Sequence, residues 1–422
     1  MKLLLKRKVL DIVKILKKAG KYRLALCIEQ NWDKTALEYS KQLNFWRPKK
    51  SMEKELLRAF DKELTRLGTR GILKLDILNS IKKRRVLQTA PHLGATESPR
   101  MLCINWLGSL AVEEKSTSTQ GGDFYVVGMF SGIPFSNRSR PGRINKKVDT
   151  INLFPSNLQD GLVYRSKIPT KLVETVDQLP NKISKFLPLA VLGNSYTKWA
   201  LETCQHIEGT ILKKNNLVFL DINEVVTEYL AQVLQNRFHV LHKIFFNPKW
   251  RKEFIEAFPN EAMFYVPIMD GKYEKIENMT LFGNILKGKT KKIDLSNSKI
   301  LIRELKEGRL CPALLTSFVA LSFLNQFKCL GSFAQVEYLP VYQEKLAKLK
   351  FMKEFKIEKI PTANLTTGLF PEKENVYPAD MIIKNKKLKQ GGKILFGELL
   401  LNMKSVLLES YFIGDNRKHD KK

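Results

Sequence analysis

The chain has 422 residues, of which 44% are hydrophobic and 10% aromatic, so it can bury a large core and is not a disordered protein. No stretch reaches the roughly 18 consecutive apolar residues of a membrane helix, because even the apolar segment 310–324 contains Pro312 and three hydroxyl side chains. A net charge of +30 favours phosphates, polyanions or anionic surfaces as partners. The basic residues are spread along the whole chain, however, so a solvated basic surface explains the charge as well as a nucleic-acid footprint does.

The first 80 residues have the periodicity of helices. Residues 2–18 alternate apolar and basic side chains at helical spacing, which predicts an amphipathic helix on the fold, with attachment to a membrane surface as the alternative. A second apolar stripe runs from Leu56 to Leu67, and Gly68 and Gly71 follow it as stop signals. We therefore predict an N-terminal helical subdomain over residues 1–80.

From residue 81 onward, expected strands and helices alternate, which is the pattern of a parallel sheet with crossover helices. We predict an α/β fold whose Rossmann-like parallel-sheet core covers residues 81–350. Residues 351–422 form a C-terminal extension that packs on this core and ends in a charged tail at 417–422. The expected elements are strands at 85–89, 124–130 and 217–221, and helices at 99–112, 196–213, 224–238, 312–325 and 335–350.

The five cysteines are widely separated and never form a Cys-x-x-Cys pair, which indicates a reducing compartment, most simply the cytoplasm. Metal ligands are not evident. His239 and His242 share one helical face, but no third ligand lies near them in the sequence.

The first candidate site is the turn at 89–99, where an expected strand ends and a helix begins. Helix N-termini at the carboxyl edge of a parallel sheet bind phosphates and carboxylates. Gly94 lets a ligand approach the backbone, and His92 can donate a hydrogen bond or act as a general acid or base. We assign His92, Gly94 and Thr96 to binding of a nucleotide such as ATP or another anion. The alternative is a capping turn whose histidine is satisfied by backbone groups.

The second candidate site is the loop at 131–143, which follows the next strand and opens onto the same edge of the sheet. Ser131 and Asn137 can position a substrate. The loop also carries three arginines that can clamp a carboxylate or phosphate in bidentate fashion, namely Arg138, Arg140 and Arg143. An ordinary basic surface loop explains the same residues.

Residues 283–290 match the P-loop pattern Gly-x-x-x-x-Gly-Lys-Thr. A P-loop needs a long helix directly after the Lys-Thr pair, whereas residues 291–298 have the pattern of a strand and a polar turn. We interpret the match as a β-hairpin.

Several segments resemble the cysteine-adding enzymes of bacillithiol biosynthesis. The turn 89–99 is similar to that family's Thr-Gly-Gln-Gln-Pro-Gly-Leu-Phe-Thr-Gly-Pro turn, and residues 124–128 resemble its Phe-Trp-Ile-Ala-Gly strand. Residues 195–199 and 217–221 resemble a helix start and a strand that occur there in the same order. Residues 329–338 resemble its Gly-Gly-Pro-Gly-Glu-Val-Ala-Tyr segment, so the matches are collinear from about residue 85 to 345.

The chain also departs from this family. An acidic Glu-Asp-His-Asp group after the second strand is replaced here by residues 129–134, which contain no acid or histidine. The paired glutamines of the turn are Pro91 and His92, the Gly-Glu pair before Tyr338 is Ala334 and Gln335, and the chain has no room for the family's long coiled coil.

The resemblance implies an amide-forming ligase that joins an amino acid, cysteine-like in this family, to a small amine acceptor. In that interpretation His92, Ser131 and Asn137 are catalytic. Substrate binding falls to Thr89, Arg138, Arg140, Arg143, Gln335 and Tyr338. Two alternatives belong to other classes: a basic module that binds tRNA, or takes its amino acid from aminoacyl-tRNA, and a non-catalytic basic scaffold.

Overall fold

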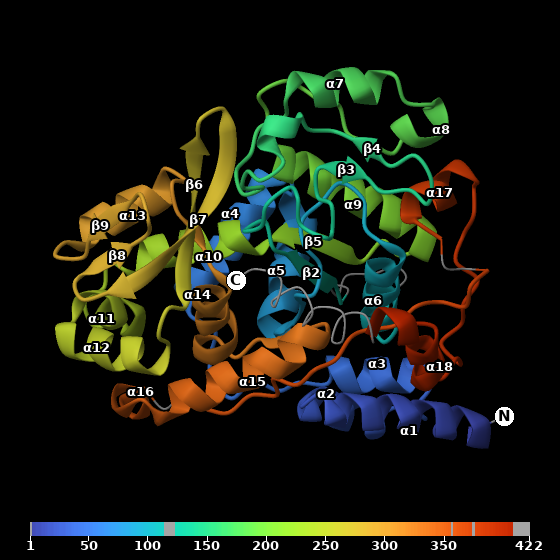
Figure 1. Ribbon diagram of the computed structural model, residues 1–422, viewed down its shortest axis with the longest axis horizontal. Coiled ribbons are helices and arrows are strands. Elements are labelled where there is room, and N and C mark those ends of the chain that lie inside the picture. The colour runs from blue at the N-terminus through green and yellow to red at the C-terminus, as the bar shows by residue number, and fades with distance from the viewer. Residues whose placement is uncertain (1, 114–122, 356–357, 374–375, 408–422) are drawn as a thin grey trace, which may run out of the picture.

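A four-stranded parallel sheet lies at the centre of the computed structural model, which describes residues 2–113, 123–355, 358–373 and 376–407 (Figure 1). The strand order is β11-β1-β2-β5. Strands β2 and β5 pair over five positions, from Tyr125 with Leu217 to Met129 with Asp221. The strands are β1 (Val86–Gln88), β2 (Tyr125–Met129), β5 (Leu217–Asp221) and β11 (Lys328–Leu330). The expected α/β class and parallel sheet are confirmed.

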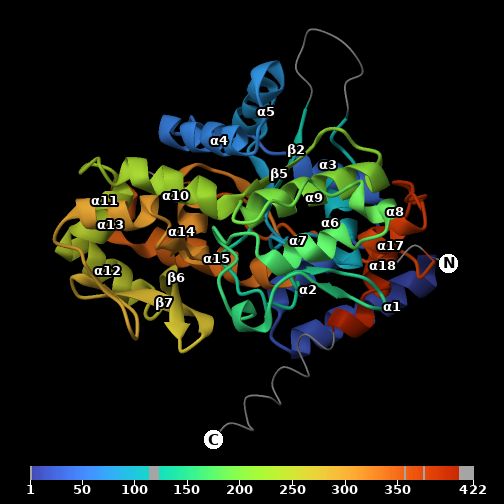
Figure 2. The same cartoon turned by 90° about the horizontal axis from the view of Figure 1, so that it is seen from above.

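Both faces of this sheet are buried, because alternate residues of each strand enter two different hydrophobic cores. Tyr125 and Val127 belong to one core, whereas Val126 belongs to the other. The first core includes helical residues from 2–44, 99–109, 196–212 and 396–401, and the second includes helical residues from 54–84, 222–257 and 314–318. The protein therefore has helical layers on both sides of the sheet (Figure 2).

The N-terminal region is helical, as its periodicity predicts. Thr35 and Glu38 form a reciprocal capping box that starts α3. The outer turns of α4 and α5 project from one side of the molecule (Figure 2). The helices of this region are α1 (Lys2–Lys18), α2 (Tyr22–Glu29), α3 (Ala36–Asn44), α4 (Lys54–Arg66) and α5 (Gly71–Arg84).

Between the strands of the parallel sheet the chain forms further helices, several of which begin at capping residues. Ser98 caps α6, Ser195 caps α9, and Asn247 caps α12 with Pro248 as the first helical residue. These elements are α6 (Pro99–Ser109), α7 (Thr170–Asp177), α8 (Asn181–Ser184), α9 (Tyr196–Leu212), α10 (Ile222–Val233), α11 (Val240–Phe246) and α12 (Pro248–Ala257), with a short ribbon of β3 (Arg143–Ile144) and β4 (Ile151–Asn152) and a 3-10 turn at Ser156–Leu158.

A second, antiparallel sheet has the order β10-β6-β7-β8-β9 and was not predicted. It includes residues 283–290, which lie in the consecutive hairpins of β7, β8 and β9, so the interpretation of the P-loop match as a hairpin is confirmed. The strands are β6 (Ala262–Asp270), β7 (Tyr273–Phe282), β8 (Ile285–Lys287), β9 (Lys292–Asp294) and β10 (Cys311–Pro312).

The remaining helices complete the fold around the sheet. The expected apolar helix at 312–325 begins as an α-helix and continues as a π-helix at Val319–Leu324. The expected charged tail at 417–422 lies outside the described residues. The helices are α13 (Ser298–Lys306), α14 (Leu314–Phe318), α15 (Phe333–Lys348), α16 (Lys350–Glu354), α17 (Pro378–Ile383) and α18 (Phe396–Leu401).

None of the helices in the described ranges combines the length and the apolar character needed to cross a bilayer.

Candidate functional site

A cavity of about 1090 Å³ lies at the carboxyl edge of the parallel sheet. After β1 the chain continues toward β2 on one side, whereas β11 pairs with β1 on the other side. Ligands of open α/β sheets bind in the crevice outside such a reversal of strand order. Residues from the loops after β1, β2 and β11 line the cavity, and we call it the β1–β11 cavity.

Two helices begin at this cavity. Helix α6 contributes Ser98 and the residues of its first turn, and helix α15 contributes Ser332 and Ala334. The Ser98 hydroxyl accepts a hydrogen bond from the Met101 N–H at 3.4 Å, whereas the Ser332 side chain makes no capping bond. The first N–H groups of both helices therefore provide positive potential at one place, which suits a phosphate or carboxylate.

Gln335 adds a buried polar group to the first turn of α15. It is 3% exposed, and the Thr89 hydroxyl donates to its Oε1 at 3.0 Å. Its Nε2 has no hydrogen-bond partner within the described part of the chain, although Gln335 lines the cavity. A buried donor without a partner costs about 1–3 kcal/mol, and a ligand acceptor would recover this energy.

His92 has a defined tautomer. Asn137 Oδ1 accepts hydrogen bonds from the N–H and the hydroxyl of Ser139, both at 3.0 Å, which orients the amide. His92 Nδ1 lies 3.1 Å from the same oxygen, so Nδ1 carries the proton. Burial, partly opposed by this hydrogen bond, and the positive charge of Arg100 lower the pKa of His92. At neutral pH the ring is neutral, and Nε2 keeps the lone pair of a general base.

The charges around the β1–β11 cavity are mainly positive. Arg100, Arg138 and Lys147 line it, whereas Glu372 is the one acidic residue among the lining side chains of the described ranges. Arg138 is exposed to solvent. Together with the two helix N-termini, these cations make the cavity suitable for an anion.

The structure brings six of the eleven predicted site residues to this cavity. They come from the loops that follow β1 and β2 and from α15. The six are Thr89, His92, Asn137, Arg138, Gln335 and Tyr338.

The other five have different surroundings. Ser131 is fully buried, and its hydroxyl donates to Asp221 Oδ1 at 2.8 Å. The Thr96 hydroxyl accepts from the Asn145 N–H at 2.7 Å. Gly94 packs closely against the loop, because an added Cβ would lie 3.0 Å from Pro141 Cα. Arg140 is exposed and has φ of +53°. Arg143 is half-buried at the start of β3.

The lining residues that sequence reasoning missed include two groups. Ser98 and Arg100 belong to the start of α6, and the Ser-Pro pair at 98–99 is a helix-start signal that could have identified them. The second group comes from the C-terminal region, which packs against the cavity at large sequence separation and offers no local signal. It comprises Leu369, Glu372, Tyr377 and Val406.

In the four described ranges, no three His, Cys, Asp or Glu side chains cluster in a way that could hold a metal ion. The five cysteines are free and buried.

A comparison with known protein families finds no family that matches this chain, and no curated protein matches it.

Proposed function

We propose that the β1–β11 cavity binds a small anionic substrate and that the protein is an amide-forming ligase, which joins an amino acid to an amine acceptor. The observation that carries the proposal is the convergence of the α6 and α15 N-termini with the unpartnered amide nitrogen of Gln335. The strand order of the parallel sheet and the helices on both faces support a Rossmann-like core for this site. The collinear resemblance to the bacillithiol cysteine-adding enzymes supports the same reaction class.

His92 is the group best suited to move a proton in this reaction. Its Nδ1 is held by Asn137, and the lone pair of its Nε2 can accept the proton that an amine loses when it forms an amide. Asn137 acts as the residue that fixes the imidazole rather than as a base.

The lining also suits the phosphates of ATP, because Gln335 Nε2, the two helix N-termini and Arg138 are all donors or cations. When bound, ATP supplies the activation of a carboxylate that amide formation requires.

Thermal unfolding with and without ligands tests the proposal. The probes are ATP, ADP, inorganic pyrophosphate and each amino acid. A ligand at a hundredfold over its dissociation constant adds about 2.7 kcal/mol to the stability of the folded state. We expect Arg138→Gln to weaken this effect, whereas Arg140→Gln, two residues away on the same loop but outside the cavity lining, leaves it unchanged.

Equal responses of both arginine variants would contradict the placement of the anion. Retention of full biological activity by His92→Gln and Arg138→Gln would favour a non-catalytic scaffold.

A second candidate function, binding of tRNA or another polyanion, is favoured by the outer face of α1. Its apolar face is buried against the fold through Leu5, Val9, Ile12, Val13 and Leu16. Seven exposed basic residues cover its outer face, namely Lys2, Lys6, Arg7, Lys8, Lys14, Lys17 and Lys18. Filter binding of bulk tRNA at increasing salt tests this function, because neutralised phosphates give a steep loss of affinity with salt. Absence of binding at low salt would reject it.

A further inference from the structure

A second cavity, of about 910 Å³, lies on the other side of the loop that follows β2. Phe135 of this loop lines it, whereas Asn137 and Arg138 line the β1–β11 cavity. The residues directly before α7 and α9, Pro169 and Ser195, also line it. We call it the α7–α9 cavity.

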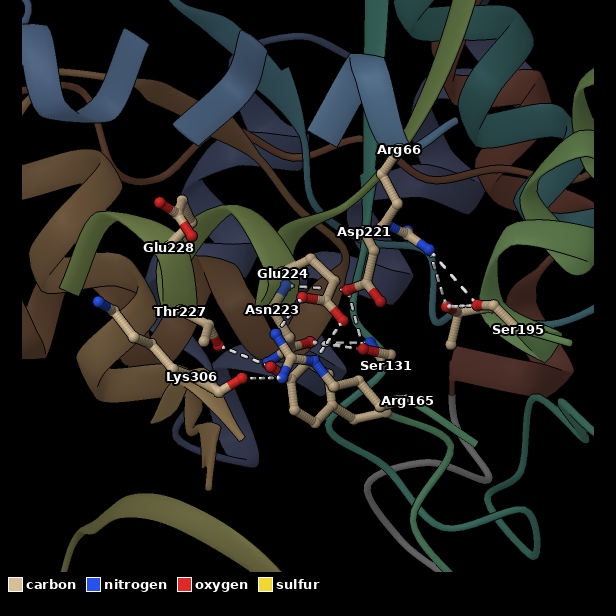
Figure 3. A network of polar contacts seen from close by, with 12 residues as sticks. Arg66, Ser131, Arg165, Ser195, Asp221, Asn223, Glu224, Thr227, Glu228 and Lys306 are labelled. Atoms are coloured by element: carbon tan, nitrogen blue, oxygen red, sulfur yellow. Dashed lines mark hydrogen bonds and ion pairs between the residues drawn. The ribbon is translucent and has the colours of Figure 1, made fainter. Parts of the chain in front are cut away.

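Two arginines of this cavity are held rigidly by carboxylates. Arg66 binds Glu63 through Nε and Nη2 at 2.6 and 2.8 Å, and Arg165 binds Glu224 through the same two atoms at 2.8 Å each. Figure 3 shows Arg66 and Arg165 on opposite sides of Asp221. Bidentate pairs of this kind fix the guanidinium plane and leave Nη1 pointing elsewhere.

The acidic lining residues are all engaged. Besides Glu63 and Glu224, Glu228 pairs with Lys62, Glu307 pairs with Arg309, and Glu274 accepts the Leu162 N–H at 3.1 Å. Four of these five carboxylates are therefore paired with a cation, whereas Glu274 keeps its negative charge.

The basic groups near the start of α9 are less engaged. Arg66 Nη1 reaches the hydroxyls of Ser195 and Thr197 only at 3.4 Å, the outer limit of a hydrogen bond (Figure 3). Lys198 lies 3.7 Å from Glu202 in a partly exposed pair, which is a weak interaction. Lys167 makes no ion pair with any residue that the structure describes.

Asp221 lies between Arg66 and Arg165, although it is not itself a lining residue of the cavity (Figure 3). It is fully buried, and its Oδ1 accepts hydrogen bonds from the Ser131 hydroxyl at 2.8 Å and the Asn223 N–H at 2.9 Å. Its Oδ2 has no hydrogen-bond partner in the described ranges. Burial and the carboxylates of Glu224 and Glu63 raise the pKa of Asp221 to about 8. At neutral pH the proton therefore resides on Oδ2, because Oδ1 already accepts two bonds.

Apolar side chains complete the cavity. Ile168, Pro169, Leu158 and Leu162 line it beside the polar groups. An organic ligand with an anionic end and a short apolar body matches this division of the surface.

We infer that the α7–α9 cavity is a second binding site, which takes a small organic anion with its carboxylate or phosphate group between Arg66, Ser195 and Lys198. Lys167 lies next to this position because its backbone forms an isolated antiparallel β-bridge with Ser195. The first turn of α9 adds the positive potential of a helix of 17 residues. This site is independent of the function proposed for the β1–β11 cavity.

Isothermal titration calorimetry at neutral pH and low salt tests the inference, with inorganic pyrophosphate and succinate as separate probes for phosphate and carboxylate chemistry. The test variant is the double substitution Lys167→Gln and Lys198→Gln, because both side chains reach solvent and their loss leaves the Arg66–Glu63 pair intact. Lys182→Gln, on the exposed surface of α8, is the matched control.

We expect the wild type to bind at least one probe at a site that does not depend on Arg138. The lysine double variant should lose about tenfold or more of the affinity at this site, since each lost charged contact is worth a large share of such binding. Lys182→Gln should behave as the wild type does.

Unchanged stoichiometry and affinity in the double variant would overturn the inference, as would a single wild-type site that Arg138→Gln abolishes. Failure of Arg138→Gln to weaken any binding, with a normal loss in the lysine variant, would instead count against the proposed function alone.

Discussion

The two cavities lie at the same edge of the parallel sheet but use their polar residues differently. In the β1–β11 cavity one buried donor, the Nε2 of Gln335, has no hydrogen-bond partner within the described ranges. In the α7–α9 cavity Arg66 and Arg165 are paired with the carboxylates of Glu63 and Glu224, and Glu63 also accepts the Asp221 N–H and so links α4 to the end of β5. Substitutions in the first cavity should therefore change ligand binding, whereas substitutions of the paired arginines in the second should mainly change stability.

The largest expected effect is on stability, from Arg66→Ala. This substitution leaves the Glu63 carboxylate, whose side chain is 1% exposed, without its cation. Breaking a buried pair by removing one partner costs about 3–5 kcal/mol. Denaturant unfolding should show this loss in the free energy of unfolding.

The control for this prediction is Lys17→Ala. Lys17 pairs with Glu29 at 3.0 Å, and both side chains are well exposed, so its loss should cost less than about 1 kcal/mol. Similar losses in the two variants would show that the Arg66–Glu63 pair does not stabilise the fold in the way described.

The next effect is on the chemical step. His92→Gln removes the proposed base and should lower the rate of amide formation by about a hundredfold. The pKa of His92 is lowered, so the wild-type rate should stay constant at neutral pH and fall only as the pH drops below this lowered value. A pH–rate profile measured with the amino acid and acceptor that stabilise the protein checks both points, and an identical profile in His92→Gln would exclude His92 as the base.

A smaller effect concerns Asp221, whose pKa is raised to about 8 in the folded protein. Folding therefore takes up a proton between about pH 4 and pH 8, and the contribution of this group to stability falls as the pH rises through that window. Asp221→Asn mimics the neutral carboxyl and should remove this fall. The free energy of unfolding of the wild type relative to the variant should decrease by at least about 1 kcal/mol from pH 5 to pH 8.

A constant difference between the two proteins over this range would mean that Asp221 is ionised in the folded state. Arg66 and Arg165 would then lie on either side of a buried carboxylate rather than of a neutral carboxyl group.

The smallest effect is expected for Arg140→Gly. Arg140 has φ of +53°, a region that costs a residue with a side chain about 1 kcal/mol and that glycine adopts freely. The variant should change stability by less than about 1 kcal/mol and bind ligands as the wild type does. A clear loss of ligand affinity would restore Arg140 as a substrate-binding residue.

The sequence predicts the parts of the fold that local signals determine. Strand β5 has the expected bounds because residues 217–221 form a short apolar run between helical patterns. Helices α6 and α9 start within a residue of their expected positions because Ser98 and Ser195 are strong N-caps.

The antiparallel sheet was missed because its long strands are only partly buried. Strand β7 alternates lysine, glutamate and apolar residues, and β6 becomes exposed toward Asp270, so neither has the apolar run that marks the parallel strands. Its pairing depends on a hairpin that brings Asp270 beside Tyr273.

Sequence reasoning predicts a site residue correctly where that residue directly follows a strand. It fails where long-range packing determines the surroundings of the residue. Thr89 follows β1 and lines the cavity. Gly94 packs against Pro141, and Thr96 bonds to Asn145, contacts that no local pattern encodes. The same holds for Tyr377, which reaches the cavity from the C-terminal region.

A crystal structure of the protein with the ligand that gives the largest thermal shift tests the central claim most directly. We predict an anionic group of the ligand next to Gln335 Nε2 and the first turn of α15, with His92 Nε2 facing the reacting part of the molecule. A ligand bound away from both helix N-termini, with Gln335 Nε2 still unpartnered, would contradict the assignment of the β1–β11 cavity as the functional site.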